Sequence, residues 1–529
     1  MRILGVYRIY TYRSRRGMVL ITAMWIVIAL TAVVLVLCRE MVVEAQVTRQ
    51  HLAQARADAA EIGAEQYVLS VVEQEMFTPG YKDSASFEQR QIGECYFWVL
   101  TYNIDDPDEA TYKYGITDEA SKVDINTWPV EALEFLPGMD QYPNLASEIV
   151  DWRDPDDLVT LSDAGGQGAE SNDYMATYGY PAKNGPFETV EELRLLADVD
   201  DVILHGADLN HNGVMDPEET AAADASFSFE SSKVGILPFV TTYGLKATNL
   251  DTTSTMVTGN LIYSPIQDLN LTDNNQNPIT APIDVNNSTA SAMNGPLQLM
   301  LNQVLGQRAT AIRTATANIT SQQANANNAT ANMFTSVFDW AIRANVTSQE
   351  LAQIYPYLDC RPLPPPNNST NSAYTQVGRL NITTASRAAL LCLPGLEETD
   401  VDTIIAEREE QSATTDANGN SQVSNIAWLM DFIDPAKLQQ AGKYITGSST
   451  IFSADIVTVS QDGRAFKRVK IVVDASSGTP LIVYRRDMTD AGWPLDPGIR
   501  EALRKGEPLP GAGMTDGSTP GSRLSAGVR

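Results

Sequence analysis

The first pattern in the sequence is an apolar run that extends without interruption from Met18 to Cys38. It contains no charged residue and no proline, and its 21 residues are enough to cross a bilayer as a helix. Good helix formers follow it, and no proline occurs before Thr78. A stripe at spacings of three and four residues continues through Leu52, Ala55, Ala59, Ile62, Gln66 and Leu69. We therefore predict one helix over residues 18–78, about 90 Å long, whose first half is a single membrane anchor.

The residues around the apolar run indicate its orientation in the membrane and whether it is removed from the mature chain. Arginines stand on its N-terminal side, at Arg8, Arg13, Arg15 and Arg16. Because positive charge favours the cytoplasmic side, the bulk of the chain should lie across the membrane. No small-x-small site follows the run, which argues against a secretory signal that is removed. An anchor that is retained without any processing is the simple alternative.

Alternating and β-branched residues predict strands on both sides of a long insertion. Residues 94–106 and 110–119 each have a strand pattern, and residues 453–487 contain three more strands separated by turns. We therefore predict an α+β protein in which the long helix packs on an antiparallel sheet. A large, mostly helical domain, residues 117–450, should interrupt that sheet.

The predicted insertion contains an internal repeat. Residues 122–140, KVDINTWPVEALEFLPGMD, and residues 379–397, RLNITTASRAALLCLPGLE, are identical at seven of nineteen positions. Each copy ends in Leu-Pro-Gly and leads into a further helix, which predicts a helix-hairpin-helix. This motif can bind DNA phosphates, but phosphate binding needs basic neighbours. Here the flanking residues are acidic, so a packing role is favoured and nucleic-acid binding is not expected: Asp140, Glu148, Asp151, Asp154, Asp156, Asp157, Glu397, Glu398, Asp400 and Asp402.

Composition narrows the possible functions. The 529 residues leave room for several domains, and the net charge of −29 opposes bulk attraction to nucleic acid. Three scattered histidines offer no zinc site and no Ser-His-Asp arrangement, so we do not expect an enzyme. Cys38 lies in the anchor, and Cys95, Cys360 and Cys392 could form one disulfide without the sequence indicating which pair.

Residues 208–219, DLNHNGVMDPEE, have the spacing of an EF-hand calcium loop. Gly213 stands at the sixth position, where the chain must turn sharply. The predicted ligands are the side chains of Asp208, Asn210, Asn212, Asp216 and Glu219 and the carbonyl of Val214. Oxygen ligands that end in a bidentate glutamate favour calcium, with modest affinity because only three are carboxylates. An acidic loop without a metal is the alternative.

The N-terminal features together resemble the type IV pilin family. A short basic leader that ends in Gly17 precedes a long helix with an apolar first half. In that family a prepilin peptidase cuts on the cytoplasmic side of the anchor, which implies a cut between Gly17 and Met18 and methylation of the new N-terminus. Most pilins have glutamate as the fifth mature residue, where this chain has Thr22.

A missing glutamate at this position is typical of one branch, the K-type minor pseudopilin of the type II secretion system. Three tracts occur in the order seen in that branch, at residues 118–139, 149–157 and 180–196. The resemblance implies a non-enzymatic subunit at the tip of the pseudopilus, anchored once in the bacterial inner membrane with its bulk in the periplasm. It also implies a role in protein secretion, with other minor pseudopilins, the inner-membrane platform and the prepilin peptidase as partners.

K-type pseudopilins bind calcium in a loop of their helical domain, so the resemblance implies a second metal cluster. Its candidate ligands are Asp154, Asp156, Asp157 and Asp173. Helix capping and solvated charge explain the same residues equally well.

The sequence thus divides into six predicted parts. They are a leader (1–17), the anchor and extended helix (18–78), a first part of the pilin-like body (79–116), the inserted domain (117–450) with hairpin repeats at about 122–155 and 379–410, the closing strands (451–486) and a disordered tail (487–529). Two alternative functions stay open: a DNA-uptake pseudopilin that uses its hairpins, and a calcium-dependent adhesion module on a plain anchor.

Overall fold

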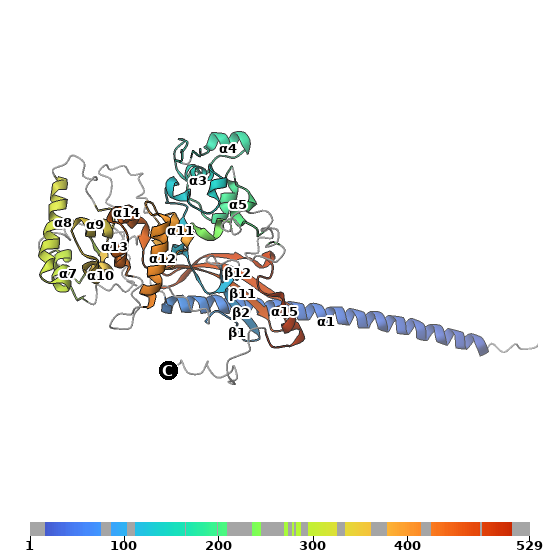
Figure 1. Ribbon diagram of the computed structural model, residues 1–529. Coiled ribbons are helices and arrows are strands. Elements are labelled where there is room, and N and C mark those ends of the chain that lie inside the picture. The colour runs from blue at the N-terminus through green and yellow to red at the C-terminus, as the bar shows by residue number, and fades with distance from the viewer. Residues whose placement is uncertain are drawn as a thin grey trace, which may run out of the picture.

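The structure of the chain is a computed structural model (Figure 1). It describes residues 16–75, 86–102, 112–163, 165–197, 199–208, 219, 235–244, 269–272, 278–279, 282–286, 295–324, 334–360, 378–413, 425–476 and 479–509.

A single helix, α1 (Arg16–Glu75), carries the anchor and 60 residues in all, which confirms the predicted long helix. Its apolar half projects away from the rest of the molecule (Figure 1) and is exposed throughout its most apolar window, whose mean hydropathy is 2.8. By length and composition this helix can cross a membrane once.

The second half of α1 packs on the sheet through a face of small residues. Ala57 and Ala64 are fully buried, and the same face includes Ala53, Ala60, Val68 and Val72. The stripe that indicated the helix lies away from this face, since Leu52 and Ile62 are 49% and 57% exposed. Alanines let the helix backbone approach the sheet closely, whereas larger side chains would hold it away.

The sheet has seven strands, and its main path runs in the order β1-β2-β11-β12-β13 with antiparallel pairing. β3 pairs with β2, and β4 pairs with β11. The strands are β1 (Arg90–Ile92), β2 (Cys95–Tyr102), β3 (Tyr112–Tyr114), β4 (Thr117–Asp118), β11 (Ile451–Ser460), β12 (Phe466–Asp474) and β13 (Leu481–Asp487). The predicted α+β fold is confirmed, since strands from before and after the insertion form one sheet.

The opposite face of the sheet is covered by the C-terminal helix α15 (Pro497–Lys505), which follows η10 (Thr489–Ala491). Ile499 and Leu503 pack on Trp98 and Val457 of the sheet. The predicted disorder from residue 487 onward is therefore wrong up to residue 509; residues 510–529 lie outside the described part. The Gly- and Pro-rich composition did not indicate this helix, which is stabilised by the packing of its apolar side chains on the sheet.

The insertion is mainly helical and shares one apolar core that extends from Val123 to Ile445. Its α-helices are α2 (Val130–Leu133), α3 (Leu145–Arg153), α4 (Ser171–Thr177), α5 (Asp201–His205), α7 (Pro296–Leu305), α8 (Arg308–Ala324), α9 (Val337–Arg343), α10 (Ser348–Ile354), α11 (Arg387–Leu391), α12 (Glu398–Ala413), α13 (Leu429–Phe432) and α14 (Pro435–Ala441). Its 3₁₀ helices are η1 (Glu119–Ser121), η2 (Met139–Gln141), η3 (Val190–Leu195), η5 (Leu237–Phe239), η7 (Tyr355–Tyr357), η8 (Ile426–Trp428) and η9 (Gly442–Tyr444).

Three short parallel strand pairs interrupt the helices. They are β5 (Val123–Asp124) with β6 (Val240–Thr241), β7 (Ile283–Asp284) with β8 (Leu358–Asp359), and β9 (Leu380–Asn381) with β10 (Ile445–Thr446). Figure 1 shows three groups of helices: α3 to α5, then α11 to α14 beside the sheet, and α7 to α10 at the end of the molecule opposite the anchor.

The cysteines form no disulfide. Cys38 is an exposed thiol, and Cys95, Cys360 and Cys392 are buried free thiols. The bridge that the sequence allowed is therefore absent, because the fold places Cys95 in the sheet and the other two at separate positions of the insertion.

Two adjacent buried carboxylates join the insertion to the sheet. Asp118, in β4, accepts hydrogen bonds from Asn381 Nδ2 at 2.8 Å and from Thr384 Oγ1 at 2.6 Å, across more than 260 residues of sequence. Burial raises the pKa of Asp118, although these hydrogen bonds oppose that shift. This carboxylate ties the sheet to the group α11–α14.

Glu119 makes the matching connection on the other side. It accepts from Lys122 Nζ at 2.6 Å, from Thr241 Oγ1 at 2.5 Å and from Ser453 Oγ of β11 at 2.5 Å. Burial would raise its pKa, but Lys122 and Lys470 outweigh burial and lower the pKa to about 2. Glu119 is therefore a charged, compensated group at the junction.

We expect Glu119→Gln to lower the free energy of unfolding by roughly 3 kcal/mol, because Lys122 would keep its charge in a buried position without a counter-ion. Urea denaturation of the detergent-solubilised chain measures this change. Glu191→Gln is the control, because its ion pair with Arg486 is exposed and should contribute less than about 1 kcal/mol.

The same pair of proteins tests the charge state of Glu119. A depressed pKa stabilises the fold above the ordinary value of 4.5, and this stabilisation is lost as the pH falls toward about 2. The stability difference between wild type and Glu119→Gln should thus be constant above pH 5 and shrink at lower pH. A difference that stays unchanged down to pH 2 would show that Glu119 is not ionised in the folded chain.

Candidate metal centre

An acidic cluster lies where helix α3 ends. The helix buries Ile149 and Trp152 and stops at Asp154, which is extended with φ −80° and ψ 159°. This conformation is the one that a following proline, here Pro155, imposes on its neighbour. The end of α3 therefore directs Asp154 and the chain after it toward the start of α4.

Helix α4 brings in the second part of the cluster. Glu170 is the residue before its first turn, and its backbone N–H donates to the Asp173 carboxylate at 3.1 Å. Tyr174, which is fully buried, packs its ring edge on Trp152 of α3 with ring centroids 5.1 Å apart. This aromatic contact holds the two helices together and sets the position of Glu170.

Three carboxylates converge between the helices. Ligand oxygens of Asp154, Asp156 and Glu170 lie within 4.8 Å of one another. Glu170 is only 3% exposed, and among the described residues its carboxylate has a loose capping contact with the backbone N–H of Asp173 but no well-aligned hydrogen bond. Oδ1 of Asp154 is buried and lacks a partner in the same way. Native proteins rarely leave such groups unsatisfied, which makes the cluster a candidate site for a cation.

The electrostatics agree with the geometry. Burial, reinforced by Asp156 and Asp151, raises the pKa of Asp154 to about 6. Burial, reinforced by Asp151 and Asp154, raises the pKa of Glu170 to about 7. Burial also raises the pKa of Asp151, whose carboxylate accepts from Thr160 N at 3.0 Å. Each carboxylate makes the ionisation of the others more costly, which a bound cation would relieve.

The nearby cationic side chain is engaged elsewhere. The guanidinium of Arg153 donates to the backbone carbonyls of Ile125 and Trp128, so it braces α3 against the start of the insertion. The donor set of the cluster consists of oxygen atoms alone, and its members are hard ligands. A divalent cation of the calcium type fits it, whereas zinc would favour nitrogen or sulfur.

The structure brings together two of the four residues predicted for this cluster. Asp154 and Asp156 are members, while Asp157 is exposed beside them and contributes to the raised pKa of Glu170. Asp173 caps the backbone of α4. Sequence reasoning missed Glu170, although its place three residues before Asp173, as in a capping box, could have indicated it.

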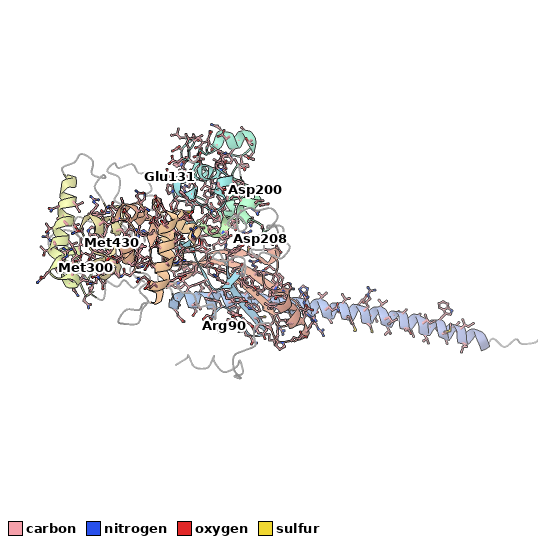
Figure 2. All side chains as sticks on the ribbon, in the orientation of Figure 1. Arg90, Glu131, Asp200, Asp208, Met300 and Met430 are labelled. Atoms are coloured by element: carbon pink, nitrogen blue, oxygen red, sulfur yellow. The ribbon has the colours of Figure 1, made fainter. Side chains whose placement is uncertain are left out.

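The predicted EF-hand loop can be followed only at its two ends. Asp208 and Glu219 are described and buried, whereas Asn210, Asn212, Val214 and Asp216 lie outside the described residues. Asp208 lies between α5 and the sheet (Figure 2). Burial and then these two carboxylates raise the pKa of Tyr102 in β2. Asp208 and Glu219 thus both affect the pKa of the same phenol, that of Tyr102. Calcium binding by the loop stays a prediction.

The predicted processing site lies at the edge of the described region. The backbone of Gly17 and Met18 belongs to the first turn of α1, and the leader residues 1–15 lie outside the described part. The cut between these two residues also stays a prediction.

The two predicted hairpin repeats share a local turn. Gly138 and Gly395, the glycines of the Leu-Pro-Gly tracts, have φ values of 81° and 82°, which glycine adopts without strain. At the second turn Lys437 is paired with Glu397 at 3.2 Å and Asp400 at 2.6 Å. A phosphate there would meet carboxylates, so the geometry offers no support for DNA binding.

Comparison with known proteins gives one family. The sequence model of the family described as type II secretion system (T2SS), protein K, matches residues 131–206. These residues extend from α2 through α5 and contain the acidic cluster. No curated protein matches the chain by sequence.

Among solved structures, the chain is similar to one chain in the crystal structure of the GspK-GspI-GspJ complex from the enterotoxigenic Escherichia coli type 2 secretion system. The similarity covers 83% of this chain and 98% of the other, with 10% sequence identity and a TM-score of 0.36. Such a score is too low to transfer any geometry. The match to the type II secretion system protein K family thus covers residues 131–206 of the 529-residue chain.

Proposed function

We propose that this pseudopilin caps the tip of a type II secretion pseudopilus and acts mechanically rather than as an enzyme. The observation that carries the proposal is the position of helices α7 to α10 of the insertion, which lie at the end of the molecule opposite the exposed anchor half of α1 (Figure 1). A domain of this bulk above the helix leaves no room for a further subunit in line with it. The single anchor would then be held in the bacterial inner membrane, with the insertion in the periplasm.

We further propose that other minor pseudopilins dock along the exposed stripe of α1. Leu52 and Ile62 remain exposed on a helix whose alanine face already covers the sheet. The solved GspK-GspI-GspJ complex contains three such subunits. A helical stripe of this kind fits between the helices of neighbours, and contact with the inner-membrane platform would follow from the shared membrane location.

We expect the double change Leu52→Glu and Ile62→Glu to leave thermal unfolding of the chain within about 1 °C of wild type, because both side chains are exposed. It should weaken co-purification with other minor pseudopilins at least tenfold. Val483→Glu, which alters an exposed apolar residue on β13 instead, is the matched control. Unchanged co-purification of the double variant would contradict docking through this stripe.

The proposal includes removal of the leader by a prepilin peptidase between Gly17 and Met18, followed by N-methylation. N-terminal sequencing of the membrane-extracted protein should give Met18 as the first residue, and Gly17→Leu should leave the precursor uncut. A mature chain that starts after residue 38, or one that retains residues 1–17, would overturn this part.

We propose that calcium binds between α3 and α4. Asp154, Asp156 and Glu170 would each hold the ion through a carboxylate oxygen, and that of Glu170 is buried without a well-aligned hydrogen bond. The ion would neutralise the mutual repulsion of the cluster and fix the chain between residues 154 and 170. The loop 208–219 remains a second, independent calcium proposal.

Calcium should therefore raise the melting temperature of the chain, since a ligand at 100 times its dissociation constant adds about 2.7 kcal/mol. Glu170→Gln should remove most of this effect and also stabilise the calcium-free chain, because it removes a buried charge. Asp163→Asn, an exposed carboxylate of the same segment, should keep the full response. Differential scanning calorimetry with calcium or chelator measures both.

A second variant distinguishes calcium binding by the loop 208–219 from calcium binding by the cluster. Glu219→Gln added to Glu170→Gln should abolish the remaining response if the loop binds calcium. A response of the same size in both variants would leave the loop as an acidic turn, and a full response in Glu170→Gln would reject the cluster.

A further inference from the structure

The three parallel strand pairs of the insertion bound three segments of the chain. We name them by these strands as the first unit (residues 123–241), the middle unit (283–359) and the third unit (380–446). The first and third contain the two repeats that are visible in the sequence. The middle unit lies in a stretch with no visible similarity to either.

Each unit opens and closes in the same way. Its first strand pairs with its last, and in each pair both residues are matched in register. The residue after the first strand donates its N–H to the final residue of the last strand. These bonds are Ile125 N to Thr241 O at 3.1 Å, Val285 N to Asp359 O at 3.0 Å and Ile382 N to Thr446 O at 3.0 Å.

The turn after the first strand is also the same in all three units. A side-chain oxygen of the second strand residue accepts the N–H two residues later: Asp124 from Asn126 at 2.9 Å, Asp284 from Asn286 at 3.0 Å and Asn381 from Thr383 at 3.1 Å. Just before each last strand lies a 3₁₀ helix, η5, η7 or η9. The elements that open and close each unit are thus the same.

The strongest match joins the first and middle units. Asn126 donates to the carbonyl of Phe187 at 3.0 Å and accepts from its N–H at 2.7 Å. Asn286 makes the same two bonds with Phe334, at 2.8 and 3.0 Å. A second match joins the first and third units, in which Arg153 and Arg408 each brace the turn through two backbone carbonyls.

The chain leaves for the middle unit and returns from it at neighbouring positions of the remaining fold. A Cβ placed on Gly244 or on Gly378 would lie 2.6 Å from Cβ of Asp124. The Cα atoms of these glycines are therefore no more than about 8 Å apart, a gap that two residues bridge. The chain leaves the first unit and enters the third at the same place.

The packing of the middle unit agrees with this attachment. Its helix α9 contacts α14 and η9 of the third unit, and α10 contacts η8 and α13. Asn425 Nδ2 donates to the carbonyl of Ala352 at 2.5 Å across this boundary. The junction with the sheet involves the other two units, through Thr241 on one side and Asn381 on the other.

We infer that residues 283–359 are a third copy of one helical unit, inserted between the other two, and that the sheet and the other two units do not require this copy in order to fold. The inference does not depend on the calcium or tip proposals. It assigns a fold to a part of the chain that shows no sequence similarity to the two repeats. The insertion then contains three units instead of two.

The equivalence of the units is tested in the full chain with Asn286→Leu and Asn126→Leu. Each change removes both bonds to the matching phenylalanine and leaves its backbone groups unsatisfied. Hydrogen exchange followed by mass spectrometry should show roughly tenfold faster exchange, within residues 282–360 for Asn286→Leu and within residues 123–206 for Asn126→Leu. Faster exchange of β11 and β12 in Asn286→Leu would overturn the inference.

Removability is tested by deleting residues 245–377 and joining Gly244 to Gly378 through two glycines. This deletion should keep a cooperative thermal transition and the exchange protection of β11 and β12. Deletion of residues 380–446 is the control and should abolish the transition, because Asp118 loses Asn381 and Thr384. Loss of the cooperative transition in the first deletion would show that the middle unit is part of the essential core.

Discussion

The burial of two adjacent carboxylates at the start of the insertion is the constraint on which the rest of the structure depends. Asp118 and Glu119 are removed from water, so each must find partners or cost several kcal/mol. Asp118 finds them in the third unit, and Glu119 finds them in the first unit and in β11. Because the two side chains leave the backbone at neighbouring positions, their partners are held at fixed distances from one another. This fixes the insertion on the sheet.

Glu119 at the junction behaves in the opposite way to the carboxylates of the acidic cluster. At the junction Lys122 and Lys470 outweigh burial and lower the pKa of Glu119. In the cluster the neighbours are carboxylates, and the pKa values of Asp154 and Glu170 rise with burial. A compensated carboxylate serves the fold, whereas an uncompensated one is stable only when a proton or a cation joins it. This difference supports the proposal that the cluster, unlike Glu119, binds a cation.

The two faces of helix α1 make different contacts. Its alanines allow close contact with the sheet, and Arg485 of β13 bonds to Glu61 and Glu65 to fix the rotation of the helix. Leu52 and Ile62 are left on the outside, whereas Val68 and Val72 are buried with the alanines. A subunit whose helix inserts among other helices needs exposed apolar side chains for these contacts. If α1 packed on the sheet through Leu52 and Ile62, these two side chains would not be available.

The sequence by itself determined the elements that depend on local pattern. The apolar run and the absence of proline gave the long helix, the β-branched tracts gave the strands, and the Leu-Pro-Gly repeats marked two of the three units. It indicated Asp154 and Asp156 but missed Glu170, because a ligand from a second helix is defined by packing such as that of Tyr174 on Trp152. Which face of α1 is buried, how the C-terminal helix is ordered and where the middle unit belongs were decided only by the tertiary structure. Each of these depends on contacts between residues far apart in the chain, whose energies no local pattern contains.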